Sequence, residues 1–349
     1  MVKIICIIGA RPQFIKHFPL EIELRKFAEV ISIHTGQHYD ESMSDIFFNE
    51  LNISKPDYHL KLEKNSHAGQ TAEMLIQIEE ILMKEAPNFV LVYGDTNSTI
   101  AGALSAAKLG IRIIHVEAGL RSYNRSMPEE INRVLTDHLS TFLFCSSLQG
   151  IKCLEKEGIT SGVFLCGDLM RDSLFLIHER LKNDINQPYL FATFHRPYNT
   201  DNPERLVRII NALNQVNKKI IFPVHPRTRK ILENQVFDFS AYANIDFIQP
   251  VGYVECLKLQ KFSDCIITDS GGIQKEAYWL MKKCITIRSE TEWVETLLGN
   301  WNQLVFENLD VISDRISQQP DMASYQSDLY GKGESAKLIA QSIYKNSVL

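Results

Sequence analysis

Residues Val90 to His138 contain two apolar runs that each end at an acidic residue, and the rest of the chain is interpreted around them. The first reads Val90-Leu-Val-Tyr-Gly94-Asp95-Thr96, and the second reads Ile113-Ile-His-Val-Glu117-Ala-Gly119. In a parallel sheet such runs are buried strands, and the residues at their carboxyl ends line the ligand crevice. We therefore predict that Asp95 and Glu117 face one cleft from neighbouring strands.

A third acid follows in Pro128-Glu129-Glu130, where the proline suits the first position of a helix. Asp95, Glu117 and Glu129 are then predicted to converge on one cleft. Simpler interpretations stay open. Asp95 can cap the next helix, and Glu129 or Glu130 alone suits the positive end of a helix dipole. Glu117 stands before a turn, so capping explains it less well. His115 is interpreted as a hydrogen-bonded structural histidine rather than as a base.

Upstream of this stretch, strand-like runs also alternate with helical patterns. Val2–Ile8 breaks at Gly9-Ala-Arg-Pro12, and Val30–His34 ends in a polar segment that contains Gln37 and His38. Repeated strand–helix units with short loops predict a doubly wound parallel sheet. Arg11 is either an ordinary surface arginine or, as we favour at the mouth of such a sheet, an anion ligand. The turn lacks the Gly-x-Gly-x-x-Gly fingerprint and gives no evidence for NAD.

A second series of strand–helix units follows Gly167-Asp168, which we interpret as a hinge. Five apolar runs in this half each deliver polar residues at the carboxyl end, and five in series predict a ligand-binding rim. We expect ligand contacts from two residues of the first half and from ten of the second: Gln37, His38, His195, Arg196, His225, Tyr253, Ser270, Gly271, Gly272, Glu276, Arg288 and Glu292.

The best candidate for binding phosphate is Ser270-Gly-Gly-Ile-Gln-Lys-Glu276, which follows a strand and opens a helix. Two glycines allow close approach of the backbone, and the helix N-terminus offers free N–H groups. A plain tight turn is the alternative. Glu276 can accept hydrogen bonds from ribose hydroxyls, and His195 and Arg196 add donors. A nucleotide diphosphate on this half, with carboxylates on the other, indicates a nucleotide-sugar enzyme.

Composition limits the class of protein. The 349 residues include 45% hydrophobic residues, enough for two ordinary domains, and the net charge of −5 does not indicate a nucleic-acid surface. The seven cysteines show no zinc spacing and suggest reduced thiols. The sequence contains no signal peptide and no apolar stretch long enough to span a bilayer. We therefore expect a soluble cytoplasmic protein without nucleic-acid or membrane partners.

These motifs resemble the non-hydrolysing UDP-N-acetylglucosamine 2-epimerases over essentially the whole chain. The most specific pieces are Gly94-Asp-Thr96, His115-Val-Glu-Ala-Gly-Leu-Arg121, Pro128-Glu-Glu-Ile-Asn-Arg133 and Thr268-Asp-Ser-Gly-Gly-Ile-Gln-Lys-Glu-Ala277. The resemblance implies two Rossmann-like domains of the glycosyltransferase-B type, a homodimer, and no metal or redox cofactor. It also implies that the last helix returns to the first domain, which gives domains of residues 1–168 with 334–349 and of residues 169–333.

The resemblance also implies roles for individual residues. Asp95, Glu117 and Glu129 would be catalytic acids or bases, and His195 would be essential near the phosphates. UDP would be held by Arg11, Ser270, Gly271, Gly272 and Glu276. The expected reaction interconverts UDP-N-acetylglucosamine and UDP-N-acetylmannosamine through loss and re-addition of UDP, for surface polysaccharide precursors.

Three segments depart from the common family pattern. Ala10 and Gln13 stand where Thr and Glu are usual, Tyr198 replaces a Glu, and Trp293 replaces an Arg. Such variants look like the branch that acts on UDP-2,3-diacetamido-2,3-dideoxyglucuronate for O-antigen or capsule, which is the alternative substrate. A glycosyltransferase of the same fold and a nucleotide-sugar sensor are more distant alternatives.

Overall fold

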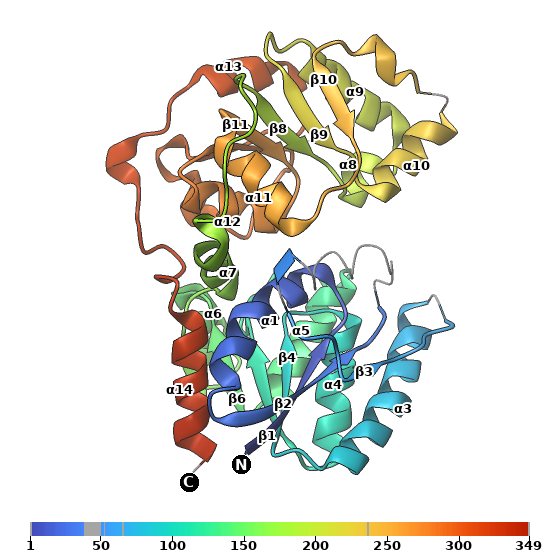
Figure 1. Cartoon of the computed structure of the whole chain (residues 1–349), viewed down its shortest axis with the longest axis vertical. Coiled ribbons are helices and arrows are strands. Elements are labelled where there is room, and N and C mark those ends of the chain that lie inside the picture. Colours follow the sequence, from blue (N-terminus) through green and yellow to red (C-terminus); the bar gives the residue numbers. More distant parts are fainter. Residues whose placement is uncertain (1, 38–49, 52, 65, 236, 348–349) are drawn as a thin grey trace. The chain divides into compact units, whose positions relative to one another are not determined.

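The chain forms two compact α/β units, Met1–Leu176 with Asp328–Leu349 and Ile177–Ser327 (Figure 1). The computed structural model describes residues 2–37, 50–51, 53–64, 66–235 and 237–347. The sequence also predicts a helix near residues 41–51, and most of that segment lies outside these ranges. The compact units divide after Leu176 and after Ser327, which are eight and six residues from the domain limits predicted at 168/169 and 333/334.

The first unit is built on a seven-stranded sheet in the order β3-β2-β1-β4-β5-β6-β7, and all neighbouring strands are parallel. The strand order reverses between β1 and β4, which is the switch point at which such sheets bind ligands. The strands are β1 (Val2–Ile8), β2 (Ala28–His34), β3 (Tyr58–His59), β4 (Phe89–Tyr93), β5 (Arg112–Val116), β6 (Phe142–Cys145) and β7 (Val163–Leu165). The predicted doubly wound parallel sheet is confirmed.

Helices connect and flank these strands. The bounds are α1 (Arg11–Leu24), α3 (His67–Glu85), α4 (Asn97–Lys108), α5 (Pro128–Leu139), α6 (Leu148–Lys156), α7 (Leu169–His178) and α14 (Ser335–Ser347). α14, at the C-terminal end of the chain, packs against α1 in this unit (Figure 1). The rings of Phe27 and Tyr344 meet edge to face beside these helices, with centroids 5.3 Å apart.

The core of the first unit lies between β1, β4 and the helices on one face of the sheet. Val90 and Val92 of β4 and Ile5 and Ile7 of β1 are fully buried. Each such aliphatic side chain contributes about 1.5–3 kcal/mol when it leaves water. A Cβ on Gly102 of α4 would lie 2.8 Å from Ile7 Cγ1, so the glycine allows the helix to approach β1 closely. This packing fixes the ends of β4 and β5.

The second unit repeats the design with a six-stranded parallel sheet in the order β10-β9-β8-β11-β12-β13. Its strands are β8 (Leu190–Thr193), β9 (Ile220–Pro223), β10 (Ile245–Ile248), β11 (Cys265–Thr268), β12 (Lys283–Thr286) and β13 (Asn302–Leu304). Its α-helices are α8 (Pro197–Thr200), α9 (Pro203–Asn214), α10 (Pro226–Asn234), α11 (Tyr253–Phe262), α12 (Gly271–Trp279) and α13 (Ile312–Ser317). α8, α9 and α10 each begin with proline, whose fixed φ suits the first helical position.

The described residues of the second unit also form four short 3₁₀ helices: η1 (Phe239–Ala241), η2 (Val294–Asn300), η3 (Leu309–Val311) and η4 (Met322–Ser324). Among the helices of the described ranges, none is both long and apolar enough to cross a membrane.

Candidate active site

Asp95 and Glu117 lie side by side because they follow the adjacent strands β4 and β5. Tyr93 pairs with Val116 in the sheet register, and the N–H of Gly94 donates to the carbonyl of Val116 at 2.9 Å. A Cβ built on Gly94 would lie 3.7 Å from Oε1 of Glu117. The carboxylate of Glu117 therefore lies beside the glycine that precedes Asp95.

Glu117 has two further unusual features. Its φ is +71°, a conformation that non-glycine residues rarely adopt and that often marks a functional site. Its carboxylate forms an ion pair with the ammonium of Lys16, which is buried on α1. Burial lowers the pKa of Lys16, but the attraction of Glu117 and Asp168 outweighs it, so the pKa is raised and the lysine is charged. This pair is a charged contact inside the unit.

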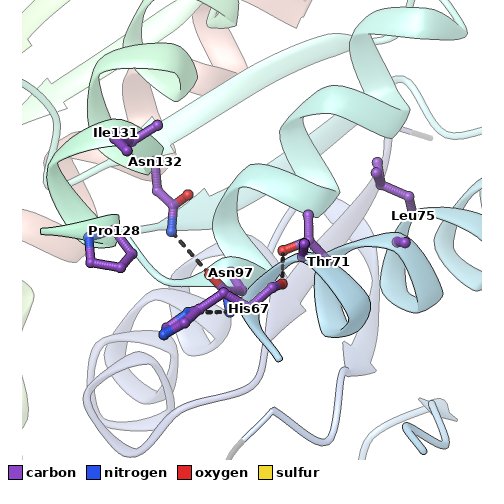
Figure 2. Close-up of a pocket in the computed structure, with 9 residues that line it drawn as sticks. His67, Thr71, Leu75, Asn97, Pro128, Ile131 and Asn132 are labelled. Atoms are coloured by element: carbon purple, nitrogen blue, oxygen red, sulfur yellow. Dashed lines mark hydrogen bonds between the residues drawn. The ribbon is translucent and has the colours of Figure 1, made fainter. Parts of the chain in front are cut away.

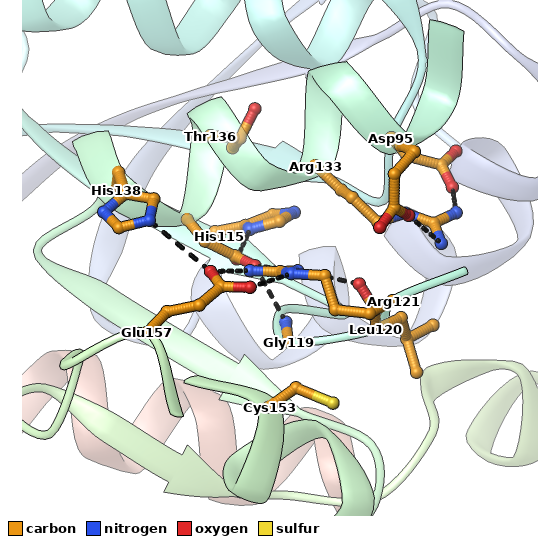
Figure 3. A network of polar contacts seen from close by, with 12 residues as sticks. Asp95, His115, Gly119, Leu120, Arg121, Arg133, Thr136, His138, Cys153 and Glu157 are labelled. Atoms are coloured by element: carbon orange, nitrogen blue, oxygen red, sulfur yellow. Dashed lines mark hydrogen bonds and ion pairs between the residues drawn. The ribbon is translucent and has the colours of Figure 1, made fainter. Parts of the chain in front are cut away.

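Asp95 is held by α5. Its carboxylate forms an ion pair with the guanidinium of Arg133 (Figure 3). Its backbone carbonyl accepts from Asn132 Nδ2 at 3.0 Å. Burial lowers the pKa of Arg133, and attraction to Asp95 and Glu130 more than offsets this and raises it. The N-cap of α4 is Thr96, whose Oγ1 accepts from the backbone of Thr99, so the interpretation of Asp95 as that cap is wrong.

The two neighbouring glutamates of α5 have different environments. Glu130 is buried and accepts from the N–H and Oγ of Ser122 and from the N–H of Tyr123, each at 2.9 Å. Burial raises the pKa of Glu130, but these hydrogen bonds outweigh burial and lower it. Glu129 is exposed, and within the described ranges no hydrogen bond or ion pair joins it to Asp95 or Glu117. Its catalytic role stays a prediction.

The turn after β1 places Arg11 at the start of α1, where the residue is half-buried. Gln13 fixes this turn: its Oε1 accepts from the backbone of Gly9 and Ala10 at 2.8 and 3.0 Å. Its Nε2 donates to the carbonyl of Tyr93 at 2.8 Å. The glutamine in place of the usual glutamate therefore links the ends of β1 and β4.

Gln37 and His38 were both predicted to contact the ligand. The Oε1 of Gln37 accepts from the N–H and Oγ of Ser98 at 2.8 and 2.6 Å, so this side chain binds the N-terminus of α4. His38 lies outside the described residues.

A separate cavity of about 350 Å³ opens between α3, α4 and α5 (Figure 2). Asn97 contacts both His67 Nδ1, at 3.1 Å, and Asn132 Nδ2, at 3.3 Å. The lining is formed by His67, Ala68, Thr71, Ala72, Leu75, Asn97, Pro128, Ile131 and Asn132. It includes none of the predicted catalytic acids, and Asn132 connects it to the backbone of Asp95.

In the second unit, Asp269 follows the central strand β11 and orients the segment that carries His195. The buried carboxylate accepts from the N–H groups of His195 and Arg196 at 3.1 and 3.0 Å, and from Asn199 Nδ2 at 3.1 Å. The Nδ1 of His195 lies 3.4 Å from Asp269 Oδ1. Burial raises the pKa of Asp269, although these hydrogen bonds oppose the rise.

The N-terminus of α12 has donor groups beside it. Ser270 is the N-cap, and Gly271 and Gly272 are the first two helical residues. A Cβ built on Gly271 would lie 3.3 Å from Nε1 of Trp293 and 3.8 Å from Nη1 of Arg288. An indole N–H and a guanidinium at a helix N-terminus suit an anionic ligand. Arg288 also pairs with Glu292 at 2.9 Å.

The remaining predicted residues of the rim lie on three helices of this unit. Glu276 is buried on α12 and accepts from Gln260 Nε2 at 2.8 Å. Tyr253 is the buried first residue of α11. His225 caps α10, and its ring lies 5.7 Å from that of His195. The structure therefore brings the two histidines together at neighbouring strand ends.

Two parallel-sheet units of this design define a protein of the glycosyltransferase-B type. The chain belongs to the UDP-N-acetylglucosamine 2-epimerase family, whose model matches residues 20–344, and this confirms the resemblance found in the sequence. The chain is thus a member of an isomerase family.

Two relatives and one solved structure give the range of similarity. A UDP-N-acetylglucosamine 2-epimerase homolog from Methanococcus maripaludis is 52% identical, with 97% of this chain and 98% of the relative covered. The UDP-2,3-diacetamido-2,3-dideoxy-D-glucuronate 2-epimerase of Pseudomonas aeruginosa is 43% identical, with 98% and 99% covered. The Methanocaldococcus jannaschii UDP-GlcNAc 2-epimerase, crystallised with UDP-GlcNAc and UDP, is 39% identical with a TM-score of 0.90, and 99% and 100% of the two chains are covered.

Sequence reasoning assigned no role to Lys16, Arg133 or Asp269. For Lys16 the available signal was a charged residue within the apolar pattern of a predicted helix. Arg133 lay inside a quoted motif, but nothing in its spacing identified Asp95 as its partner. Asp269 follows an apolar strand as Asp95 does, so this pattern did not distinguish a catalytic aspartate from a structural one.

Proposed function

We propose that this chain is a non-hydrolysing UDP-N-acetylglucosamine 2-epimerase that interconverts UDP-N-acetylglucosamine and UDP-N-acetylmannosamine for surface polysaccharide precursors. The observation that carries the proposal is the pair of carboxylates, Asp95 and Glu117, at the ends of adjacent strands, each with its own cation. The M. jannaschii relative with UDP-GlcNAc and UDP supports it.

The chemistry requires more than one acid. The C2 hydrogen of the sugar is not next to a carbonyl, so direct deprotonation is difficult. When the C1–O bond breaks, UDP leaves with the electron pair, C1 gains oxocarbenium character and the C2 proton becomes acidic. A carboxylate removes that proton and a 2-acetamidoglucal forms. Return of a proton to the opposite face and re-addition of UDP at C1 invert C2, which requires acid–base groups on both faces.

Asp95 and Glu117 are the acids for which contacts support this role, and Glu129 is the third on the family resemblance. Two carboxylates side by side repel each other, and Arg133 and Lys16 supply compensating charge. The same two cations orient the carboxylates, because each ion pair joins a strand end to a neighbouring helix. Lys16 and Arg133 are therefore positioning residues in this proposal.

The second unit is proposed to bind UDP. The N-terminus of α12 and Arg288 would hold the diphosphate, Glu276 would accept from the ribose, and His195 and Arg196 would stabilise the departing phosphate. Arg11 of the first unit is proposed as a further anion ligand. Seven buried free cysteines favour a reducing compartment, so we place the enzyme in the cytoplasm, and we propose a homodimer as for the family.

The P. aeruginosa relative makes UDP-2,3-diacetamido-2,3-dideoxyglucuronate the second candidate substrate. Arginines suit a uronate carboxylate, and the segment His225-Pro-Arg-Thr-Arg229 offers Arg227 and Arg229 as candidates. In the structure Arg227 pairs with Asp201 at 2.6 Å, and Arg229 lies 3.8 Å from Glu233. A uronate would have to compete with both carboxylates, and we therefore rank UDP-N-acetylglucosamine first.

The decisive assay incubates the purified chain with each UDP-sugar, without an acceptor, and follows the anomeric and C2 signals by NMR. We expect UDP-N-acetylmannosamine to form from UDP-N-acetylglucosamine. Higher kcat/KM on the uronate would move the chain to the second candidate. If neither sugar is converted, the epimerase proposal is overturned, because a transferase needs an acceptor and a sensor does not convert its ligand. Asp95→Asn is the inactive control.

A further inference from the structure

His115 is fully buried near the end of β5, two residues before Glu117. Its Nδ1 lies 2.7 Å from Oδ1 of Asp137, and its Nε2 lies 2.7 Å from the backbone carbonyl oxygen of Gly94. Both distances are those of strong hydrogen bonds. Both ring nitrogens are therefore engaged inside the protein.

Both partners of the His115 ring are acceptors. A backbone carbonyl can only accept a hydrogen bond. Asp137 is held as a carboxylate, because its Oδ2 accepts from Arg121 Nη1 at 2.6 Å and from the N–H of Gly119 at 3.1 Å. Burial raises the pKa of Asp137, but His115 and Arg121 outweigh burial and lower it. A histidine between two acceptors has to donate from both nitrogens, which only the imidazolium does.

The charge balance of the buried cluster gives the same answer. Arg121 binds Glu157 through two parallel hydrogen bonds, each of 2.7 Å, in addition to its contact with Asp137. Two carboxylates, one guanidinium and one imidazolium sum to zero. A neutral His115 would leave one uncompensated negative charge in this cluster, in which the side chains of His115, Asp137 and Arg121 are buried and that of Glu157 is about one quarter exposed. His138 also approaches Glu157, at 3.4 Å, but it is half exposed at the edge of the cluster.

We propose that the ring of His115 carries a proton on each nitrogen and that, through both hydrogen bonds, it positions the catalytic strand ends. Its Nε2–H holds the carbonyl of Gly94, while the N–H of Gly94 is held by Val116. Both polar groups of the glycine before Asp95 are thereby fixed, and a charge-assisted bond resists displacement more than a neutral one. Glu117 follows the same strand two residues after His115. This role rests on the proposed epimerase function; the proton count on the ring does not.

The proton count can be measured directly by ¹⁵N NMR on the folded chain with ¹⁵N-labelled histidine. Spectra would be recorded at about pH 8.5, roughly two units above the ordinary pKa of histidine. His115→Gln identifies the signals among those of the ten histidines. We expect protons on both ring nitrogens of His115, because each nitrogen faces an acceptor. A ring nitrogen of His115 without a proton would overturn the proposal.

A second variant tests the cause of the charge. Asp137→Asn keeps the size of the side chain and removes its charge, so the ring of His115 should then lose one proton at the same pH. Retention of both protons in Asp137→Asn would contradict the assignment of Asp137 as the counter-ion. The ring beside Asp137 is that of His115, so the histidine signals that change in folded Asp137→Asn identify it even where His115→Gln does not fold.

Positioning is tested by kinetics. His115→Gln should lower kcat by about tenfold to a hundredfold, because small displacements of reacting groups have effects of this size. KM and the affinity for UDP should stay within about twofold, since binding of the substrate itself is not removed. His138→Gln, at the exposed edge of the same network, is the matched control and should keep normal kcat. Normal kcat in folded His115→Gln would overturn the positioning role. Inactivity of the wild type would instead count against the epimerase proposal and leave the proton count untouched.

Discussion

Each sheet places an aspartate just past a central strand, Asp95 two residues after β4 and Asp269 one residue after β11, and the two carboxylates have different partners. Asp95 follows β4 and is about one quarter exposed, and its carboxylate is paired with the side chain of Arg133. Asp269 follows β11, is completely buried, and accepts from the backbone of His195 and Arg196. A buried carboxylate whose oxygens accept hydrogen bonds from backbone N–H groups has a structural role. One that faces a side-chain cation and solvent remains available for chemistry, so the partners decide the role.

The largest expected effect is a loss of turnover when Asp95 or Glu117 is neutralised. Asp95→Asn or Glu117→Gln should lower kcat by about a hundredfold or more, the usual scale for acid–base groups. Affinity for UDP, measured by calorimetry, should stay within about twofold because the proposed UDP site is in the other unit. Near-normal kcat in both variants would contradict the assignment of Asp95 and Glu117 as the acid–base groups of the first unit.

The third acid is tested in the same assay. We expect Glu129→Gln to lower kcat on the same scale, on the strength of the family resemblance. Glu130→Gln is the matched comparison on the next residue: it should instead lower stability, because Glu130 anchors Ser122 and Tyr123. Normal turnover in Glu129→Gln would restrict the catalytic cluster to Asp95 and Glu117.

Asp269→Asn should show the opposite pattern to Asp95→Asn. An amide nitrogen in place of one carboxylate oxygen cannot accept from the N–H groups that face it, and an unsatisfied buried group costs about 1–3 kcal/mol. Urea unfolding should show a loss of this size in Asp269→Asn and a change below about 0.5 kcal/mol in Asp95→Asn. Equal losses in the two variants would contradict the assignment of only one of them as an anchor.

Lys16 tests whether the cation beside Glu117 matters for chemistry. Lys16→Met keeps the apolar stem of the side chain and removes the charge, and we expect kcat to fall by about tenfold through misplacement of Glu117. The exposed Lys26, which pairs with Glu23 on the same segment, provides the control Lys26→Met. A fall in stability with unchanged kcat would make Lys16 a structural residue only.

The smallest effect is a contrast in pH dependence between two buried acids. The pKa of Asp137 is lowered, mainly by His115 and Arg121 against burial, so its stabilising contribution is complete above the ordinary carboxyl pKa of about 3.9. That contribution is lost as the pH falls through the lowered pKa of the folded state. The pKa of Asp269 is raised by burial, so its contribution has the opposite sign and declines as the pH rises through its folded pKa. The free energy of unfolding of Asp137→Asn and Asp269→Asn would be measured against that of the wild type from about pH 3 to 7. The stability lost in Asp137→Asn should become smaller as the pH falls, whereas the stability lost in Asp269→Asn should not.

The sequence predicted the strand ends well because apolar runs that stop at polar residues report on parallel strands directly. The ion pairs of Asp95 and Glu117 were not predictable, since their cations come from α5 and α1, which are distant along the chain. Glu129 and Glu130 could not be separated either, because one residue of helical rotation decides which is buried. β13 was missed because Asn302-Gln-Leu304 is polar. Asn302 is buried there by hydrogen bonds to Thr286 and Gln274, at 2.6 and 3.0 Å, which no local pattern predicts.

The carboxylate cluster is proposed to invert C2 by elimination and re-addition of UDP, and isotopic labelling in heavy water follows both bonds that this route breaks. The wild-type chain should form UDP-N-acetylmannosamine that carries deuterium at C2 and nowhere else on the ring. Label in the oxygen that bridges C1 and the β-phosphate should scramble into the other β-phosphate oxygens. An inverted product without solvent deuterium, or with the bridging oxygen fully retained, would contradict this account.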